Sequence, residues 1–105
     1  MLTFNLKKEW FEKIKSGEKT HEYREVKDYW TTRITNYFHI DIDKLKSGIT
    51  YRYTGSFDII FQMGYGGEKL RATTKSIKII DGLNSDLKIS EPVFDIEFEL
   101  IKEEV

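Results

Sequence analysis

The sequence predicts an α+β fold: a small mixed β-barrel with two to three helices packed beside it. Two stripes of apolar residues at helical spacing lie within the first 40 residues, and several segments with the two-residue period of strands follow them. The length of 105 residues supports one compact domain with a hydrophobic core. We therefore expect a single domain over residues 1–105. The two early helices rule out a sandwich built from strands alone.

The beginning of the chain predicts a strand followed by a helix. Residues 2–5 form the strand and residues 6–16 the helix, with Asn5 as the N-cap. Gly17 then supplies the left-handed residue that ends such a helix. The buried face of this helix is an apolar stripe with i, i+4, i+8 spacing, made of Leu6, Trp10 and Ile14.

A second strand and a second helix follow. Residues 20–24 mix β-branched, aromatic and charged side chains, which predicts a short strand. Residues 28–39 predict a helix whose core-facing stripe is Trp30, Ile34, Tyr37 and Phe38.

The second half of the chain is predicted to be mostly β. The expected strands cover residues 49–54, 57–63, 70–80 and 93–101, with a turn at residues 55–56 and loops at 64–67 and 81–92. The last strand has the clearest alternation in the chain. Its expected inward residues are Phe94, Ile96, Phe98 and Leu100, and its expected outward residues are Asp95, Glu97 and Glu99.

Composition excludes several classes of protein. The chain is 39% hydrophobic and 14% aromatic, which is too much for a disordered chain. It has no cysteine, which excludes disulfides, thiolate zinc sites and a cysteine nucleophile, and its two histidines are too few for a His-rich metal site. No apolar run approaches the roughly 20 residues of a membrane helix, and the N-terminus does not resemble a signal peptide. We expect a cytoplasmic protein with no metal, no cofactor and no membrane partner, and a monomer is favoured.

The charged segment over residues 17–33 is the candidate functional region. Within the predicted strand, Glu22 and Arg24 share one face with Thr20, whereas His21 and Tyr23 share the other. One interpretation is an exposed edge strand with its charges in water. The other is a pocket in which Glu22 and Arg24 pair with each other or around a polar ligand, since burying them unpaired would cost several kcal/mol. Arginine offers a rigid planar fork, and glutamate accepts hydrogen bonds from exocyclic amines.

The same segment resembles a known domain family. Gly17, Lys19, Glu22 and Arg24 fit the pattern G-x-K-x-x-E-x-R of the ASCH domain, a member of the PUA-like superfamily. Residues 22–33 also resemble the continuation EYRE-x-K-x-YW-x-x-R of a bacterial and phage branch, and residues 61–67 resemble its F-x-x-GYG segment. The resemblance covers nearly the whole chain and implies a small β-barrel with flanking helices.

The resemblance implies a cleft lined by Lys19, Glu22 and Arg24 that binds RNA or a nucleobase- or nucleoside-like ligand. Lys19 would meet a phosphate or a carbonyl oxygen, Glu22 would accept from a base amine, and Arg24 would bind the ligand or fix Glu22. The near-neutral net charge of −1 favours recognition of one nucleotide over nonspecific tracking along a backbone. Three aromatic residues are candidates for stacking on a base, namely Tyr29, Trp30 and Tyr65. For Trp30, a place in the core stripe is the alternative.

The resemblance leaves open whether the protein is an enzyme. Some ASCH proteins hydrolyse the amide of N4-acetylcytidine, and the nucleophile proposed for them is a threonine at the position of Glu22. This chain departs from that pattern, so the nucleophile does not carry over. An amidohydrolase or a ribonuclease would instead use Lys19 and Glu22, with a water activated at Glu22. A third reading is a regulatory interaction module with a vestigial cleft.

Overall fold

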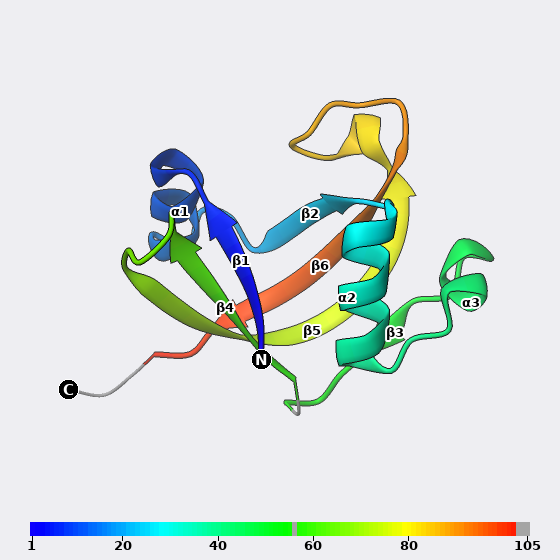
Figure 1. The fold of residues 1–105 in the computed structure, drawn as a ribbon, viewed down its shortest axis with the longest axis horizontal. Coiled ribbons are helices and arrows are strands. Elements are labelled where there is room, and N and C mark those ends of the chain that lie inside the picture. Colours follow the sequence, from blue (N-terminus) through cyan, green and yellow to red (C-terminus); the bar gives the residue numbers. More distant parts are fainter. Residues whose placement is uncertain (56, 103–105) are drawn as a thin grey trace.

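The computed structural model describes residues 1–55 and 57–102, which form an α+β domain built on one curled mixed sheet (Figure 1). The elements in chain order are β1 (Leu2–Leu6), α1 (Lys8–Lys15), β2 (His21–Glu25), α2 (Asp28–Phe38), α3 (Ile42–Lys46), β3 (Tyr51–Arg52), β4 (Asp58–Met63), β5 (Lys69–Asp81), the 3-10 turn η1 (Gly82–Asn84) and β6 (Pro92–Leu100). The predicted fold class is therefore confirmed at the level of a half-barrel sheet with flanking helices. Part of the predicted turn at residues 55–56, namely position 56, lies outside the described residues.

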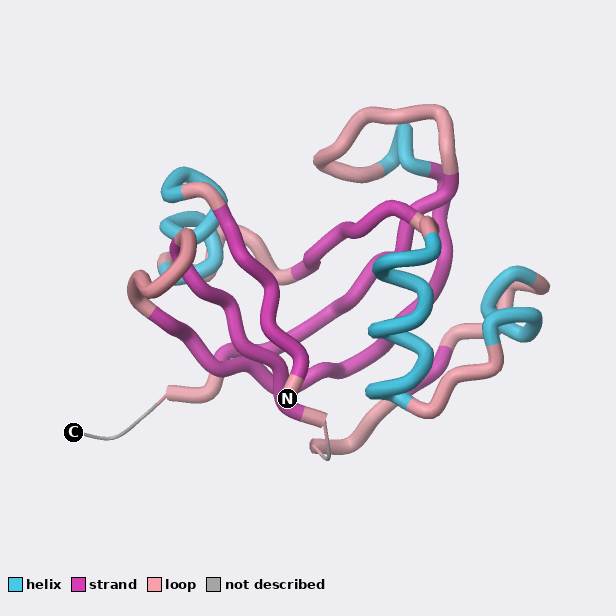
Figure 2. Tube along the Cα trace, viewed as in Figure 1, coloured by secondary structure: helices cyan, strands magenta, loops and turns pink. Residues whose placement is uncertain are grey.

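The sheet has the strand order β1-β4-β5-β6-β2, and β3 pairs with β5 beside this path. Strands β1 and β4 run parallel, whereas the other pairs are antiparallel. The curl of the sheet brings its two edge strands, β1 and β2, to opposite sides of an opening (Figure 1). Helix α2 packs against β1, where Trp30 stacks on Phe4, and α1 stands on the other side of β1 in the view of Figure 2.

The core is aromatic and draws on both helices and the sheet. Its fully buried large side chains include Phe4, Phe11, Phe38, Phe61 and Phe94. Each of them contributes about 2 kcal/mol by leaving water. The two predicted helical stripes are confirmed where they enter this core, since Ile14 and Ile34 are fully buried. The tryptophans of both stripes, Trp10 and Trp30, are only partly buried, because each also faces a cavity.

The boundary between the first strand and the first helix differs from the prediction. Leu6 belongs to β1, where it pairs with Met63 of β4, so α1 begins at Lys8. The N-cap is Lys7, without a side-chain hydrogen bond, and the expected cap at Asn5 is therefore wrong. Strand pairing with a distant segment overrides the local helical spacing of Leu6. The predicted end is confirmed, because Gly17 has φ +85°.

A short helix was missed after α2. Helix α3 begins behind Asp41, whose side chain accepts a 3.0 Å hydrogen bond from the backbone N–H of Asp43. It has five residues, too few for a periodic stripe to identify it. The strand expected at residues 49–54 shortens to Tyr51–Arg52.

One residue of the last strand is buried where the prediction placed it in solvent. Asp95 was expected to face water, but it is 5% exposed. Its carboxylate lies 2.6 Å from Nδ1 of His21 across the β2–β6 ladder. This cross-strand partner allows the carboxylate to be buried at a position that alternation assigns to solvent.

In the part of the chain that the structure describes, no helix has the length and apolarity needed to cross a membrane.

Candidate ligand-binding cavity

A cavity of about 610 Å³ lies where the curled sheet leaves β1 and β2 unpaired with each other. We call it the β1–β2 cavity. It is bounded by the end of β1, the start of α1, β2, the first turn of α2 and the loop after η1. Its lining residues are Asn5, Leu6, Lys7, Trp10, Lys19, Glu22, Tyr23, Arg24, Glu25, Lys27, Tyr29, Trp30, Asp86 and Leu87.

Glu22 and Arg24 form the centre of this cavity. The Nη2 atom of Arg24 donates to Oε2 of Glu22 at 2.6 Å, and its Nε donates to the same oxygen at 3.2 Å. Arg24 also donates from Nη2 to the backbone carbonyl of Asn5 at 3.3 Å, which links β2 to β1 across the opening. The Glu22 side chain is 5% exposed and that of Arg24 19%. Of the two faces left open by the sequence, the face with Glu22 and Arg24 is turned inward, and their charges are paired there.

Lys19 enters the same cluster from the turn between α1 and β2. Its backbone N–H donates to the carbonyl of Lys13 at 3.0 Å, which fixes the chain after the helix. Its ammonium lies 3.4 Å from Oε1 of Glu22 and forms a second ion pair with Asp86. The side chain is 9% exposed and passes over the ring of Tyr23, with Nζ 5.0 Å from the ring centroid.

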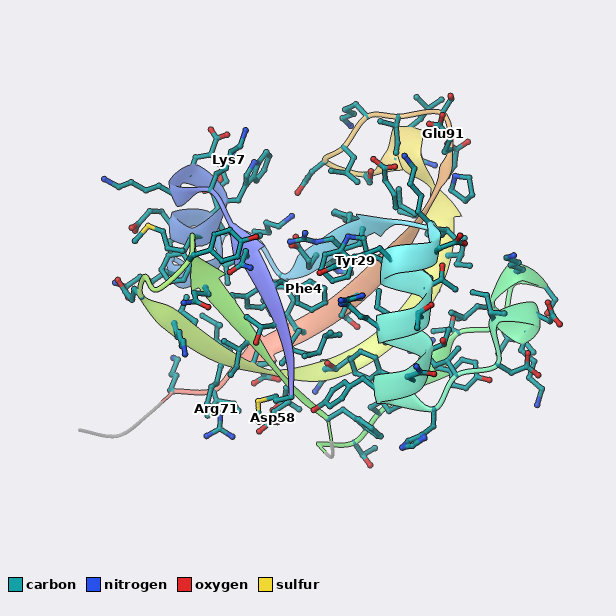
Figure 3. The ribbon with its side chains drawn as sticks, viewed as in Figure 1. Phe4, Lys7, Tyr29, Asp58, Arg71 and Glu91 are labelled. Carbon is teal, nitrogen blue, oxygen red and sulfur yellow. The ribbon has the colours of Figure 1, made fainter. Side chains whose placement is uncertain are left out.

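Aromatic rings form one wall of the β1–β2 cavity. Phe4 and Trp30 are stacked, with ring centroids 5.2 Å apart and an interplanar angle of 21°. The guanidinium carbon of Arg24 lies 4.7 Å from the Trp30 centroid and 5.1 Å from the Phe4 centroid. Tyr29 meets Trp30 edge-on and stands at the mouth, near the middle of Figure 3. Phe4 lies outside the lining, so Trp30 and Tyr29 supply the rings of this wall, and the guanidinium of Arg24 lies over the Trp30 ring.

Tyr23 supplies a neutral hydroxyl to the cavity. Burial raises the pKa of its phenol, and the carboxylates of Asp95, Asp86 and Glu22 raise this pKa further. The phenol therefore keeps its proton over the physiological range and can donate a hydrogen bond. Tyr23 lies on the face of β2 that the sequence assigned away from Glu22, yet it lines the cavity because β2 is an edge strand.

Five of the six predicted ligand-binding residues come together here: Lys19, Glu22, Arg24, Tyr29 and Trp30. Tyr65 does not join them. It lies in the loop between β4 and β5, is 94% exposed and does not line the cavity.

Trp10, Tyr23 and Asp86 are among the lining residues that sequence reasoning missed. Trp10 was assigned to the core stripe of its helix, and Tyr23 to the opposite strand face. Asp86 gave no signal, because it lies 67 residues from its partner Lys19 in a loop of ordinary polar composition.

The side chains that line the cavity carry carboxylates, ammonium and guanidinium groups, phenols and indoles. Within residues 1–55 and 57–102, the lining contains no serine, threonine, cysteine or histidine that could act as a nucleophile or a proton shuttle. Both oxygens of Glu22 already face cations, Lys19 on one side and Arg24 on the other. The described residues contain no group of three or more His, Cys, Asp or Glu side chains able to hold a metal ion.

Comparisons with known proteins give no assignment. No protein-family model matches the sequence, no curated protein is detectably similar to it, and no solved structure matches its fold. The resemblance to the ASCH domain therefore depends on the motif residues alone.

Proposed function

We propose that the protein is an ASCH-like binding module that holds a nucleobase, presented by a nucleoside or by single-stranded RNA, in the β1–β2 cavity. The observation that carries the proposal is the convergence of Lys19, Glu22 and Arg24 inside a cavity with aromatic walls. The volume of about 610 Å³ lies in the range of small-molecule sites.

The polar groups suit a planar heterocycle with adjacent donors and acceptors. Nη1 of Arg24 has no hydrogen-bond partner among the described side chains, so it is left to donate to a ring oxygen or nitrogen. The carboxylates of Glu22 and Asp86 keep lone pairs that accept from an exocyclic amine. Both types of group lie within one small cluster, which matches the mixed edge of a base better than it matches a purely anionic ligand.

The aromatic residues supply the apolar part of the recognition. Tyr29 stands at the mouth with an exposed ring. The guanidinium carbon of Arg33 lies 3.5 Å from its centroid, so a base would stack on the other face of this ring, beside Trp30. Such stacking contributes about 1–3 kcal/mol for each base.

No specific observation favours the amidohydrolase or ribonuclease alternative. That alternative would use Glu22 to activate a water. Both oxygens of Glu22 are engaged by cations. Three largely buried charged side chains that pair with one another, Lys19, Glu22 and Arg24, also argue against a vestigial cleft.

Intrinsic fluorescence tests the proposal directly. The chain has two tryptophans, and both Trp10 and Trp30 line the β1–β2 cavity. Titration with nucleosides and short single-stranded RNAs should therefore give a saturable change in emission. The variant Arg24→Ala should lose it, whereas the matched control Arg71→Ala, on β5 away from the cavity, should keep it. The absence of a saturable response up to about 1 mM ligand, or about 4 kcal/mol of binding, would overturn the proposal.

A further inference from the structure

Asp86 stands outside the motif, yet it contacts the motif lysine. It lies in the loop between η1 and β6, and its carboxylate forms an ion pair with Lys19 at the wall of the β1–β2 cavity. The position that an anionic group of a ligand would take beside Lys19 is therefore already occupied by a carboxylate of the protein itself.

The loop holds Asp86 in a defined place. The hydroxyl of Ser85, a buried residue, donates to the carbonyl of Gly82 at 2.7 Å and accepts from the N–H of Leu87 at 3.1 Å. At the base of the loop, the N–H of Gly82 donates to the carbonyl of Glu91 at 3.0 Å. The Asp81 carboxylate accepts from the N–H of Leu83 at 3.0 Å. These bonds flank Asp86 on both sides.

The charges at the centre of the cavity balance. Two cations, Lys19 and Arg24, meet two carboxylates, Glu22 and Asp86, and every one of the four is paired within the group. Inside this cluster a phosphate would meet no uncompensated positive charge, and the other two lysines of the lining, Lys7 and Lys27, are solvent-exposed. It would have to displace Asp86 from Lys19 and then lie close to that displaced carboxylate.

We propose that Asp86 is a specificity-determining residue, which makes the β1–β2 cavity accept an uncharged nucleoside or base and reject the corresponding nucleoside monophosphate. This inference rests on the proposed function. The inference also narrows the class of ligand: the part of the ligand that enters the cavity carries no phosphate. In RNA, that part is a base turned inward with its phosphates outside.

The test compares each common nucleoside with its own 5′-monophosphate by tryptophan fluorescence. The wild-type protein should bind the nucleoside more tightly. The variant Asp86→Asn should improve the affinity for the monophosphate about tenfold relative to the nucleoside, because Lys19 and Arg24 then face a single carboxylate, Glu22, and the cluster gains a net positive charge. The matched control is Glu91→Gln. It removes one negative charge from the same loop, at an exposed position that does not line the cavity and is labelled in Figure 3, and it should leave the ratio unchanged.

A second measurement needs no variant. In the wild-type protein, the preference for the nucleoside should shrink as salt increases, because screening weakens the repulsion between phosphate and carboxylate. A wild-type protein that binds the monophosphate more tightly than the nucleoside would overturn the inference, as would an unchanged ratio in Asp86→Asn. If no nucleoside binds the wild-type protein at all, the proposed function itself fails. The two failures are therefore distinguishable.

Discussion

Arg24 donates from both Nε and Nη2 to a single oxygen of Glu22, two residues away on the same face of β2. The other oxygen of Glu22 faces Lys19 at 3.4 Å. One buried carboxylate thus compensates two cations that would otherwise repel each other across the cavity. The stability of this region and its capacity to bind a ligand depend on the same carboxylate.

The first prediction concerns the loss of that carboxylate. Glu22→Ala should lower the free energy of unfolding by about 3 kcal/mol, because the largely buried Arg24 loses its carboxylate partner and Lys19 keeps only Asp86. Urea unfolding measures the difference. The control is Glu25→Ala on the same strand, whose carboxylate pairs with Lys27 in a more solvent-exposed position. There the loss should stay below about 1 kcal/mol. Equal losses in the two variants would show that the inner cluster has no special role in stability.

A second prediction concerns the base of the loop that holds Asp86. A Cβ added at Gly82 would lie 2.6 Å from the backbone oxygen of Ile89 and would also meet the carbonyl of Glu91. Backbone atoms cannot move aside cheaply, so Gly82→Ala should destabilise the protein by about 1–3 kcal/mol. It should also raise amide hydrogen exchange within the loop. Asn84→Ala, at an exposed position of the same turn, is the control and should change neither property. Unaltered exchange in Gly82→Ala would contradict this account of the loop.

The predictable part of this fold is the part that local sequence determines. The apolar stripes that contain Ile14 and Ile34 identify buried helix faces, and the left-handed position of Gly17 marks a helix end. Leu6 also fits a helical stripe, but its register with Met63 assigns it to a strand. That pairing joins segments distant in sequence, and no local pattern can reveal it.

The candidate site, like the fold, was predictable from the sequence only in part. Residues 19–24 carry a short-range pattern, so the inward cluster of Lys19, Glu22 and Arg24 could be named as one of two alternatives. The choice between the alternatives required the curl of the sheet, which places β2 beside a cavity. Asp86 could not be named at all, because its role arises only when the loop after η1 folds back over Lys19.

A third prediction follows from Tyr53. Burial, with a smaller contribution from Tyr51, raises the pKa of its phenol from 10.0 to about 12. Between pH 10 and 12 the folded state therefore holds a proton that the unfolded state has released. This contribution to stability is fully present below pH 10 and is lost as the pH rises through the folded value, so the free energy of unfolding should fall over this window.

The variant Tyr53→Phe identifies the group. It removes the titration together with the 3.2 Å hydrogen bond from the phenol to the carbonyl of Phe38. Stability at neutral pH should fall by about 1 kcal/mol, and the decline between pH 10 and 12 should become shallower. It should not vanish, since burial also raises the pKa of Tyr23 and Tyr37. Tyr65→Phe is the solvent-exposed control. A decline as steep in Tyr53→Phe as in the wild-type protein would assign the effect to other groups.

The fourth prediction separates two tyrosines that the sequence treats alike. Tyr29 and Tyr65 are both exposed, at 57% and 94%, and both are stacking candidates in the motif segments. Only Tyr29 lines the β1–β2 cavity, where it meets Trp30 edge-on with ring centroids 5.0 Å apart. Tyr29→Ala should therefore weaken nucleoside binding about tenfold, equivalent to ~1.4 kcal/mol of stacking, whereas Tyr65→Ala should leave it unchanged. Isothermal titration calorimetry measures the nucleoside affinity of both variants. It does not rely on tryptophan emission, which the loss of Tyr29 beside Trp30 would itself alter. Weaker binding in Tyr65→Ala would mean that the ligand extends to the β4–β5 loop, and unaltered binding in Tyr29→Ala would remove the mouth of the cavity from the site.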